Sequence, residues 1–258
     1  MITSQSSSHW YTKDGEPCYE VSYKDPRRGV RRTTLRDARK LNLVPSVTTI
    51  TKIIDNPTLD TWKTNQAVLS ALTLPVIEGE SEESFARRLN IDASATAEKA
   101  ANWGTAIHYG VEMYLAHGEI CSVYDGYEIG HAVQAFATWW EQSGLTLVSV
   151  EEPFASELGY GGKIDIRCTK AIVDIKTKDT KEGQEVVAYP DNGYQAVAYK
   201  QGLRLGDDVK CVNVYLSRND KSREAHIHVW DNEAELLEVF NCAFALWKAV
   251  KRYNPCKD

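Results

Sequence analysis

The sequence predicts an α/β fold in which a mixed β-sheet is flanked by helices. In the second half of the chain, helical and extended patterns follow one another in the order helix, three strands, helix, two strands and helix. That order is typical of a mixed sheet covered by helices. The chain has 258 residues, of which 43% are hydrophobic and 26% charged, so its composition is that of a globular protein with a sizeable core.

Residues 1–90 are expected to form an N-terminal region, a hairpin followed by helices. Two aromatic-rich runs within residues 9–25 flank Asp14 and Gly15, a pair typical of a tight hairpin turn. The patterns that follow are helical and cover residues 46–54, 58–72 and 81–90.

Residues 91–258 are expected to form the core of the protein. Its helices are predicted over residues 95–118, 130–144, 192–206 and 232–253, and glycines end the first two. Its strands are predicted over residues 145–154, 163–168, 171–177, 210–218 and 224–230.

Composition and charge exclude several classes of protein. No segment approaches the roughly 20 apolar residues of a membrane span, and the first residues lack a signal-peptide stretch, so we expect a cytoplasmic protein without a membrane partner. The six cysteines include no CxxC pair, which argues against zinc and iron–sulfur sites. Within the net charge of −6, residues 24–40 hold eight Lys or Arg against two Asp. Such a segment fits phosphate contact and a solvated surface about equally well.

Two acidic residues fall where a strand pair can bring them together. A turn between residues 163–168 and 171–177 would place Asp165 opposite Asp174, with Cβ atoms about 4.5 to 5.5 Å apart. Like charges at that distance are destabilising unless something compensates them. Mg²⁺ or Mn²⁺ bound by both carboxylates would do so, and Lys176 lies on the same strand face as Asp174. A shift of one residue in the register would separate the acids.

Two acids, a cation and a lysine are the groups that hydrolysis of a phosphodiester needs. The Asp-x-Lys pattern carries little weight alone, because it occurs three times, beginning at Asp174, Asp179 and Asp208. The copy at Asp174 lies in a strand-like run that has a partner acid. A solvent-exposed hairpin with mixed charges is the alternative interpretation.

Three other stretches carry further candidate residues. His108 and Glu112 are four residues apart on one face of a predicted helix, and Gln195 and Tyr199 have the same spacing in a later helix. Glu151 lies at the end of a predicted strand. Ordinary packing, or a polar strand end, is the alternative in each case.

Taken in order, these stretches resemble the PD-(D/E)xK nuclease superfamily, and more closely its RecB-like exonuclease branch. The matching stretches are GTAIH, VEEPF, GGKID, VDIKT and QAVAY, in the usual order of that branch. Residues 44–63 are also similar to the segment that precedes the core in mitochondrial genome maintenance exonucleases and related phage exonucleases. The resemblance implies a restriction-endonuclease-like core and a metal-dependent DNA exonuclease that uses Mg²⁺ or Mn²⁺.

The resemblance also implies a role for each matching residue. The implied metal ligands are His108, Asp165, Asp174 and the carbonyl of Ile175. The implied catalytic residues are Asp165, Asp174, Lys176 and His108. The implied nucleic-acid contacts are Gln195, Tyr199 and Lys178. Glu151 is a further candidate in the site, whereas Glu112 has no counterpart in the family pattern.

Partners and alternatives follow from the same resemblance. The implied substrate is single- or double-stranded DNA with free ends, and the implied context is recombination, repair or replication, with a protein partner from one of these processes. The location would be the host cytoplasm if the protein is phage-encoded. The late cysteine set of some relatives is missing, so no iron–sulfur cluster is expected. The alternatives are a structure-specific endonuclease on the same core and a non-catalytic nucleic-acid-binding module. Residues 1–90 would be a DNA-contacting appendage.

Overall fold

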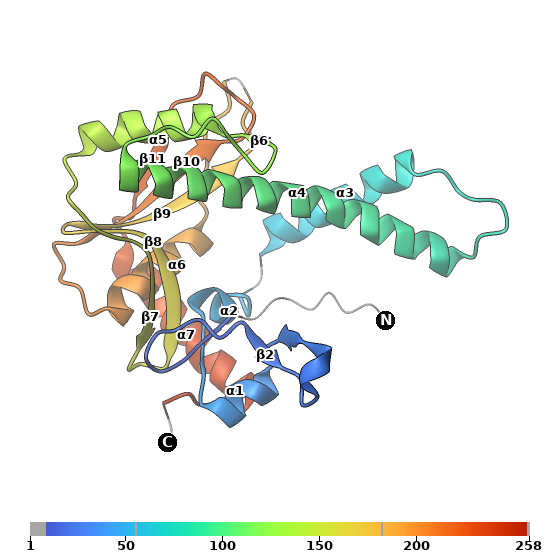
Figure 1. Ribbon diagram of the computed structural model, residues 1–258, viewed down its shortest axis with the longest axis horizontal. Helices are drawn as coiled ribbons and strands as arrows, with labels where there is room; N and C mark the ends of the chain where they lie inside the picture. Colours follow the sequence, from blue (N-terminus) through green and yellow to red (C-terminus); the bar gives the residue numbers. More distant parts are fainter. Residues whose placement is uncertain (1–8, 55, 182, 257–258) are drawn as a thin grey trace.

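A five-stranded sheet lies at the centre of the protein (Figure 1), whose computed structural model describes residues 9–54, 56–181 and 183–256. Across the sheet, the strands are β11 (His226–Val229), β10 (Lys210–Ser217), β9 (Ala171–Lys178), β8 (Tyr160–Cys168) and β7 (Leu147–Ser156). β9 and β10 are parallel, and the other neighbouring strands are antiparallel. The predicted mixed sheet is therefore confirmed.

Helices cover both faces of this sheet (Figure 1). α4 (Glu82–His117) and α5 (Gly130–Ser143) pack on one face, where Val173 and Ile175 of β9 join their apolar residues in one cluster. α6 (Pro190–Gly202) and α7 (Glu233–Lys251) pack on the other face, around Ile164 and Ile172. β10 is buried from Cys211 to Ser217, as expected for a central strand with helices on both sides.

The predicted hairpin over residues 9–25 forms only at its turn. Gly15 has a φ of +93° and its amide donates to the carbonyl of Thr12 at 3.1 Å, but the returning chain makes a single bridge, from Tyr11 to Pro17. Pro17 has no N–H to continue a ladder. Instead, β1 (Trp10–Tyr11) pairs with β4 (Val44–Pro45), and β2 (Glu20–Ser22) pairs with β3 (Val30–Arg32).

Short elements complete this N-terminal part of the fold. They are the 3-10 turn η1 (Pro26–Arg28), α1 (Leu35–Leu41) and α2 (Val47–Thr51). A separate hairpin, β5 (Val123–Tyr124) with β6 (Tyr127–Glu128), lies between α4 and α5 in the chain. Two arginines of the basic segment pair with its own acids, Arg31 with Asp37 at 2.6 Å and Arg27 with Asp25 at 3.0 Å. Part of the local positive charge is therefore compensated within the segment.

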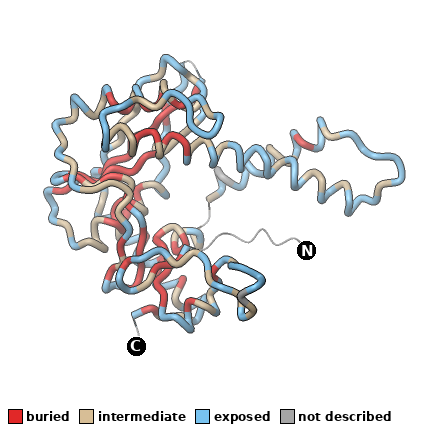
Figure 2. The backbone as a smooth tube through the Cα atoms, in the orientation of Figure 1, coloured by how far each residue is buried: buried red, intermediate tan, exposed pale blue. Residues whose placement is uncertain are grey.

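α3 (Pro57–Thr73) and the first half of α4 form an arm that extends away from the body (Figure 1). The sequence predicts two helices, over 81–90 and 95–118, but the structure has one helix of 36 residues. Residues 91–94 contain no glycine or proline, so nothing interrupts the helix there. The helix passes through the expected boundary between residues 90 and 91, and it ends at Gly118 as predicted. Most of the arm is exposed in Figure 2.

Within the described ranges, no helix combines the length and the apolar character needed to cross a membrane.

Candidate active site

Three side chains from separate elements converge at one edge of the sheet. They are His108 of α4, Glu151 of β7 and Asp165 of β8, and their ligand atoms all lie within 4.8 Å of one another. Nδ1 of His108 lies 3.6 Å from Oδ2 of Asp165. Within the described part of the chain, this is the one group of three such side chains that is close enough to share a metal ion.

Close packing of α4 on the sheet places His108 at this edge. Ala106 and Ile107 are buried against the sheet, so His108 is left at the margin with 29% of its side chain exposed. Gly104 allows the close approach, because a Cβ at this position would lie 3.1 Å from Oγ1 of Thr177 in β9. The helix therefore presents the imidazole beside β8.

Glu151 reaches the cluster through an unusual backbone conformation. Its φ is +51°, although it lies within β7 and is not a glycine. A non-glycine residue with a positive φ costs about 1–3 kcal/mol, and such residues are concentrated at functional sites. The Glu151 carboxylate forms an ion pair with Lys163 of β8. A residue that the sequence offers only as a further candidate is thus held beside Asp165 and His108.

Asp165 links β8 to β9 through its side chain. The predicted register is confirmed for Ile166 opposite Val173, but the ladder ends before the two acids. Instead, Oδ2 of Asp165 accepts a hydrogen bond from the backbone amide of Ile175 at 2.8 Å. A side-chain bond to the neighbouring strand thus takes the place of a ladder pair between Asp165 and Asp174.

Asp174 is the centre of a second, buried group of polar side chains, which includes Lys176 and Asn213. It is 1% exposed, Nζ of Lys176 lies 2.7 Å from its Oδ2, and Nδ2 of Asn213 donates to the same oxygen at 2.6 Å. Burial raises the pKa of Asp174 to about 6, Lys176 opposes this shift, and the charge of Asp165 adds to it. Asp174 therefore lies close enough to Asp165 to sense its charge, while its own oxygens bind Lys176 and Asn213.

Lys176 remains a cation in this setting. Burial alone would lower its pKa, but the charges of Asp174 and Asp165 raise the pKa above its ordinary value. Nζ of Lys176 also donates to Oε1 of Gln195 at 3.1 Å. The ammonium group is therefore fixed by partners from two elements, β9 and α6.

Gln195 and Tyr199 hold this lysine in place. Nε2 of Gln195 donates to the hydroxyl of Tyr199 at 3.0 Å, and Tyr199 is only 4% exposed. A Cβ added at Gly162 would lie 2.4 Å from Cε1 of Tyr199, so the glycine admits the ring. This burial favours a role in positioning Lys176 over direct stacking of the Tyr199 ring on DNA.

A cavity of about 470 Å³ opens onto the three-residue cluster. His108, Glu151 and Asp165 line it together with Glu112, which lies one helical turn from His108. Lys178 lies elsewhere, with its Nζ 4.1 Å from the ring centroid of Tyr189. The structure therefore brings most of the predicted site residues to one place and puts Lys178 in a neighbouring pocket.

The residues present fit a divalent cation. Two carboxylates supply the oxygen ligands that Mg²⁺ and Mn²⁺ prefer, and one imidazole is compatible with a first-row metal such as Mn²⁺. His108, Glu151 and Asp165 would hold the ion at the cavity wall, where water and a substrate oxygen have access.

Sequence reasoning missed two residues that shape the site, Asn213 and Lys163. Asn213 is fully buried in β10 and accepts a hydrogen bond from Nε1 of Trp230 at 2.6 Å, so both ends of its amide are used. Its signal was a lone amide between Val212 and Val214 in an otherwise apolar run. Lys163 gave no such signal. Its ion pair with Glu151 forms because of the unusual backbone conformation of Glu151 in β7, which the sequence does not reveal.

Comparisons with known proteins give no family for this chain. No family model and no curated protein matches it. Among solved structures, the crystal structure of SSO0001 is similar over 75% of this chain and 88% of its own, at 12% identity and a TM-score of 0.25. A likeness that weak carries no argument.

Proposed function

We propose that this chain is a metal-dependent deoxyribonuclease, built on a restriction-endonuclease-like PD-(D/E)xK core, that degrades DNA from its free ends. The observation that supports this most is the cluster of His108, Glu151 and Asp165, which lies next to a lysine fixed by Asp174 and Gln195. The hydrogen bond from the Ile175 amide to Asp165 joins these two groups.

A resident divalent cation would activate water and offset negative charge on the reacting phosphate. His108, Glu151 and Asp165 supply its ligands. Lys176 stays an ammonium group because of the charges around it, so it donates hydrogen bonds to the attacking water or to a phosphate oxygen. Asp174 and Asn213 keep that ammonium in position, and Gln195 restricts it from the α6 side.

The test is degradation of end-labelled DNA in Mg²⁺, Mn²⁺ or EDTA. Linear and circular forms, single- and double-stranded, are compared for the wild type and Asp174→Ala. We expect metal-dependent loss of linear DNA and little loss of circles, and an Asp174→Ala rate at least about 100-fold lower.

Other results would favour a different function or contradict the proposed site. Cleavage of circles as fast as linear DNA would replace the exonuclease by an endonuclease on the same core. Binding of DNA without any cleavage in either metal would favour the non-catalytic module. Equal rates for the wild type and Asp174→Ala would contradict the proposed site.

A further inference from the structure

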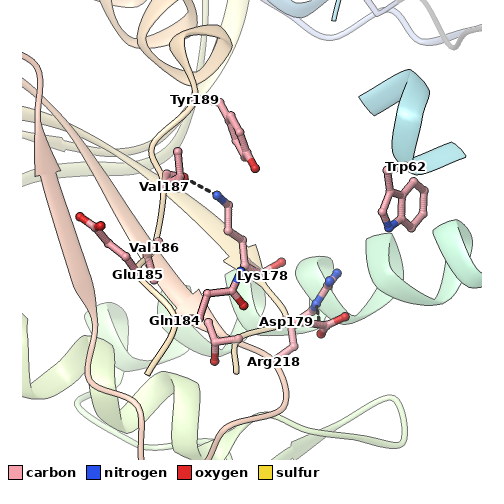
Figure 3. Close-up of a pocket in the computed structure, with 11 residues that line it drawn as sticks. Trp62, Lys178, Asp179, Gln184, Glu185, Val186, Val187, Tyr189 and Arg218 are labelled. Atoms are coloured by element: carbon pink, nitrogen blue, oxygen red, sulfur yellow. Dashed lines mark hydrogen bonds and ion pairs between the residues drawn. The ribbon is translucent and has the colours of Figure 1, made fainter. Parts of the chain in front are cut away.

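A second pocket lies beside the candidate active site, at the end of β9. Its volume is about 270 Å³, and it is lined by the strand end at Thr177 and Lys178, by the loop that carries Tyr189, and by Trp62 of α3. Figure 3 shows Trp62 on the arm, across the pocket from Lys178 and Tyr189. The arm and the core thus contribute opposite walls.

The pocket is close to Lys176 along the same strand. Side chains two residues apart leave a strand on the same face and about 7 Å apart, so Lys178 follows Lys176 on that face. Thr177, the residue between them, lines the pocket. The lysine of this pocket is therefore the next side chain after Lys176 on that face of β9.

The lining offers aromatic rings and a cation. Trp62 is 37% exposed and Tyr189 is 38% exposed, which leaves ring surface available to a ligand. Nζ of Lys178 lies 4.1 Å from the ring centroid of Tyr189 and donates to the carbonyl of Val187. Nζ also lies 4.9 Å from the ring centroid of Tyr215, so the Val187 carbonyl takes one ammonium proton and two rings hold the group by cation–π contact.

The charges around the pocket leave Lys178 as its available cation. Arg218 is engaged, because it pairs with Asp179 at 3.0 Å and donates to the carbonyl of Ala100 at 3.1 Å. The bond to Ala100 fastens α4 to the end of β10, and the pair with Asp179 joins the ends of β9 and β10. The Glu185 side chain points away from the pocket in Figure 3.

We propose that this pocket binds one unpaired nucleotide of a DNA single strand, with the base against Trp62 and Tyr189 and a phosphate near Lys178. Aromatic rings recognise any base by its face, and a nearby cation follows the backbone. Sites for small organic ligands occupy about 300–1,000 Å³, so a pocket slightly below that range holds one base and not a base pair. The inference rests on the proposed nuclease function for the identity of the polymer, and it assigns single strands as the preferred substrate.

The test measures binding without cleavage, by fluorescence anisotropy of a labelled oligothymidylate and of a labelled duplex. All variants carry Asp165→Asn, so that strand loss does not interfere. Trp62→Ala should weaken single-strand binding by about 5- to 100-fold, the effect of one stacked base, and Trp62→Phe should retain most of the affinity. Leu72→Ala is the matched control, because Leu72 is 77% exposed on the same helix. Lys178→Gln should reduce the salt dependence of binding by about one phosphate contact.

Equal affinity of Trp62→Ala and its parent would overturn the inference, as would tighter binding of the duplex than of the single strand. An equal loss in Trp62→Phe and Trp62→Ala would also overturn it, since the ring would not be the cause. If single-strand binding depends on Trp62 but the wild type never cleaves DNA, the pocket is supported and the nuclease proposal is wrong. The two ideas therefore fail separately.

Discussion

The side chain of Asp165 accepts a hydrogen bond from the backbone amide of Ile175, the residue between Asp174 and Lys176, at 2.8 Å. One carboxylate thus serves both as a candidate metal ligand and as a clamp between β8 and β9. Changing this residue tests the two roles separately, because asparagine keeps an oxygen acceptor and alanine does not.

Asp165→Asn should keep the fold and lose the activity. The amide oxygen can still accept from Ile175, but the negative charge is gone, so we expect DNA cleavage to fall at least about 100-fold. Asp165→Ala should in addition lower the free energy of unfolding by about 1–3 kcal/mol, because the Ile175 amide loses its partner. Chemical denaturation and cleavage rates of both variants check this. Equal stability of the two variants would show that the hydrogen bond from Ile175 to Asp165 does not stabilise the fold.

Asp174 should make stability depend on pH in a characteristic direction. Burial raises its folded-state pKa from 3.8 to about 6, so its contribution to stability is full below pH 3.8 and is lost as the pH rises through about 6. Asp174→Asn has no such ionisation. The decrease in unfolding free energy between pH 4 and pH 7 should therefore be smaller in Asp174→Asn, by on the order of 2 kcal/mol. Denaturant titrations across this range measure it, and parallel profiles would contradict the expectation.

Substitutions of Glu151 should separate its effect on stability from its effect on metal binding. Glycine accepts a φ of +51° without strain, so Glu151→Gly should be more stable than Glu151→Ala by about 1 kcal/mol. Both variants lose the carboxylate and should bind Mn²⁺ more weakly than the wild type. Denaturation and Mn²⁺ titration by electron paramagnetic resonance give the two readouts. Wild-type Mn²⁺ affinity in either variant would remove Glu151 from the site.

Gly162 should be sensitive to one added methyl group. In Gly162→Ala the new Cβ would meet the Tyr199 ring at 2.4 Å, so the ring must move and its bond to Gln195 is disturbed. We expect a loss of about 1–3 kcal/mol in the free energy of unfolding. Cleavage should fall as well, because Gln195 helps to fix Lys176. Unchanged activity in Gly162→Ala would argue against this positioning chain.

The sequence was sufficient for features that depend on local patterns. Alternation in β8 and β9 predicts their pairing, and Ile166 does lie opposite Val173. The helix-to-strand order predicts the mixed sheet for the same reason. In the candidate site, spacing within a single element predicted which residues share a face. Asp174 and Lys176 in β9 are one such pair, and Gln195 and Tyr199 in α6 are the other.

Contacts between distant segments were beyond such patterns. Asn213 reaches Asp174 because β10 lies parallel to β9, a pairing across 39 residues that no local period specifies. The conformation of Glu151 depends on its partners in β8 and not on its neighbours in sequence. Trp62 comes near Lys178 because α3 leaves the body at a particular angle, and helix periodicity does not encode that angle.

The most direct test of the central claim is the initial rate of cleavage of linear, labelled single-stranded DNA in Mn²⁺, for the wild type and Lys176→Met. Lys176 is not among the three clustered ligands and its positive charge acts on Asp165, so Lys176→Met should bind Mn²⁺ at least as tightly as the wild type. Its rate should nevertheless be at least about 100-fold lower, and EDTA should abolish the wild-type rate. Equal rates for the two proteins, or wild-type cleavage that persists in EDTA, would contradict the account.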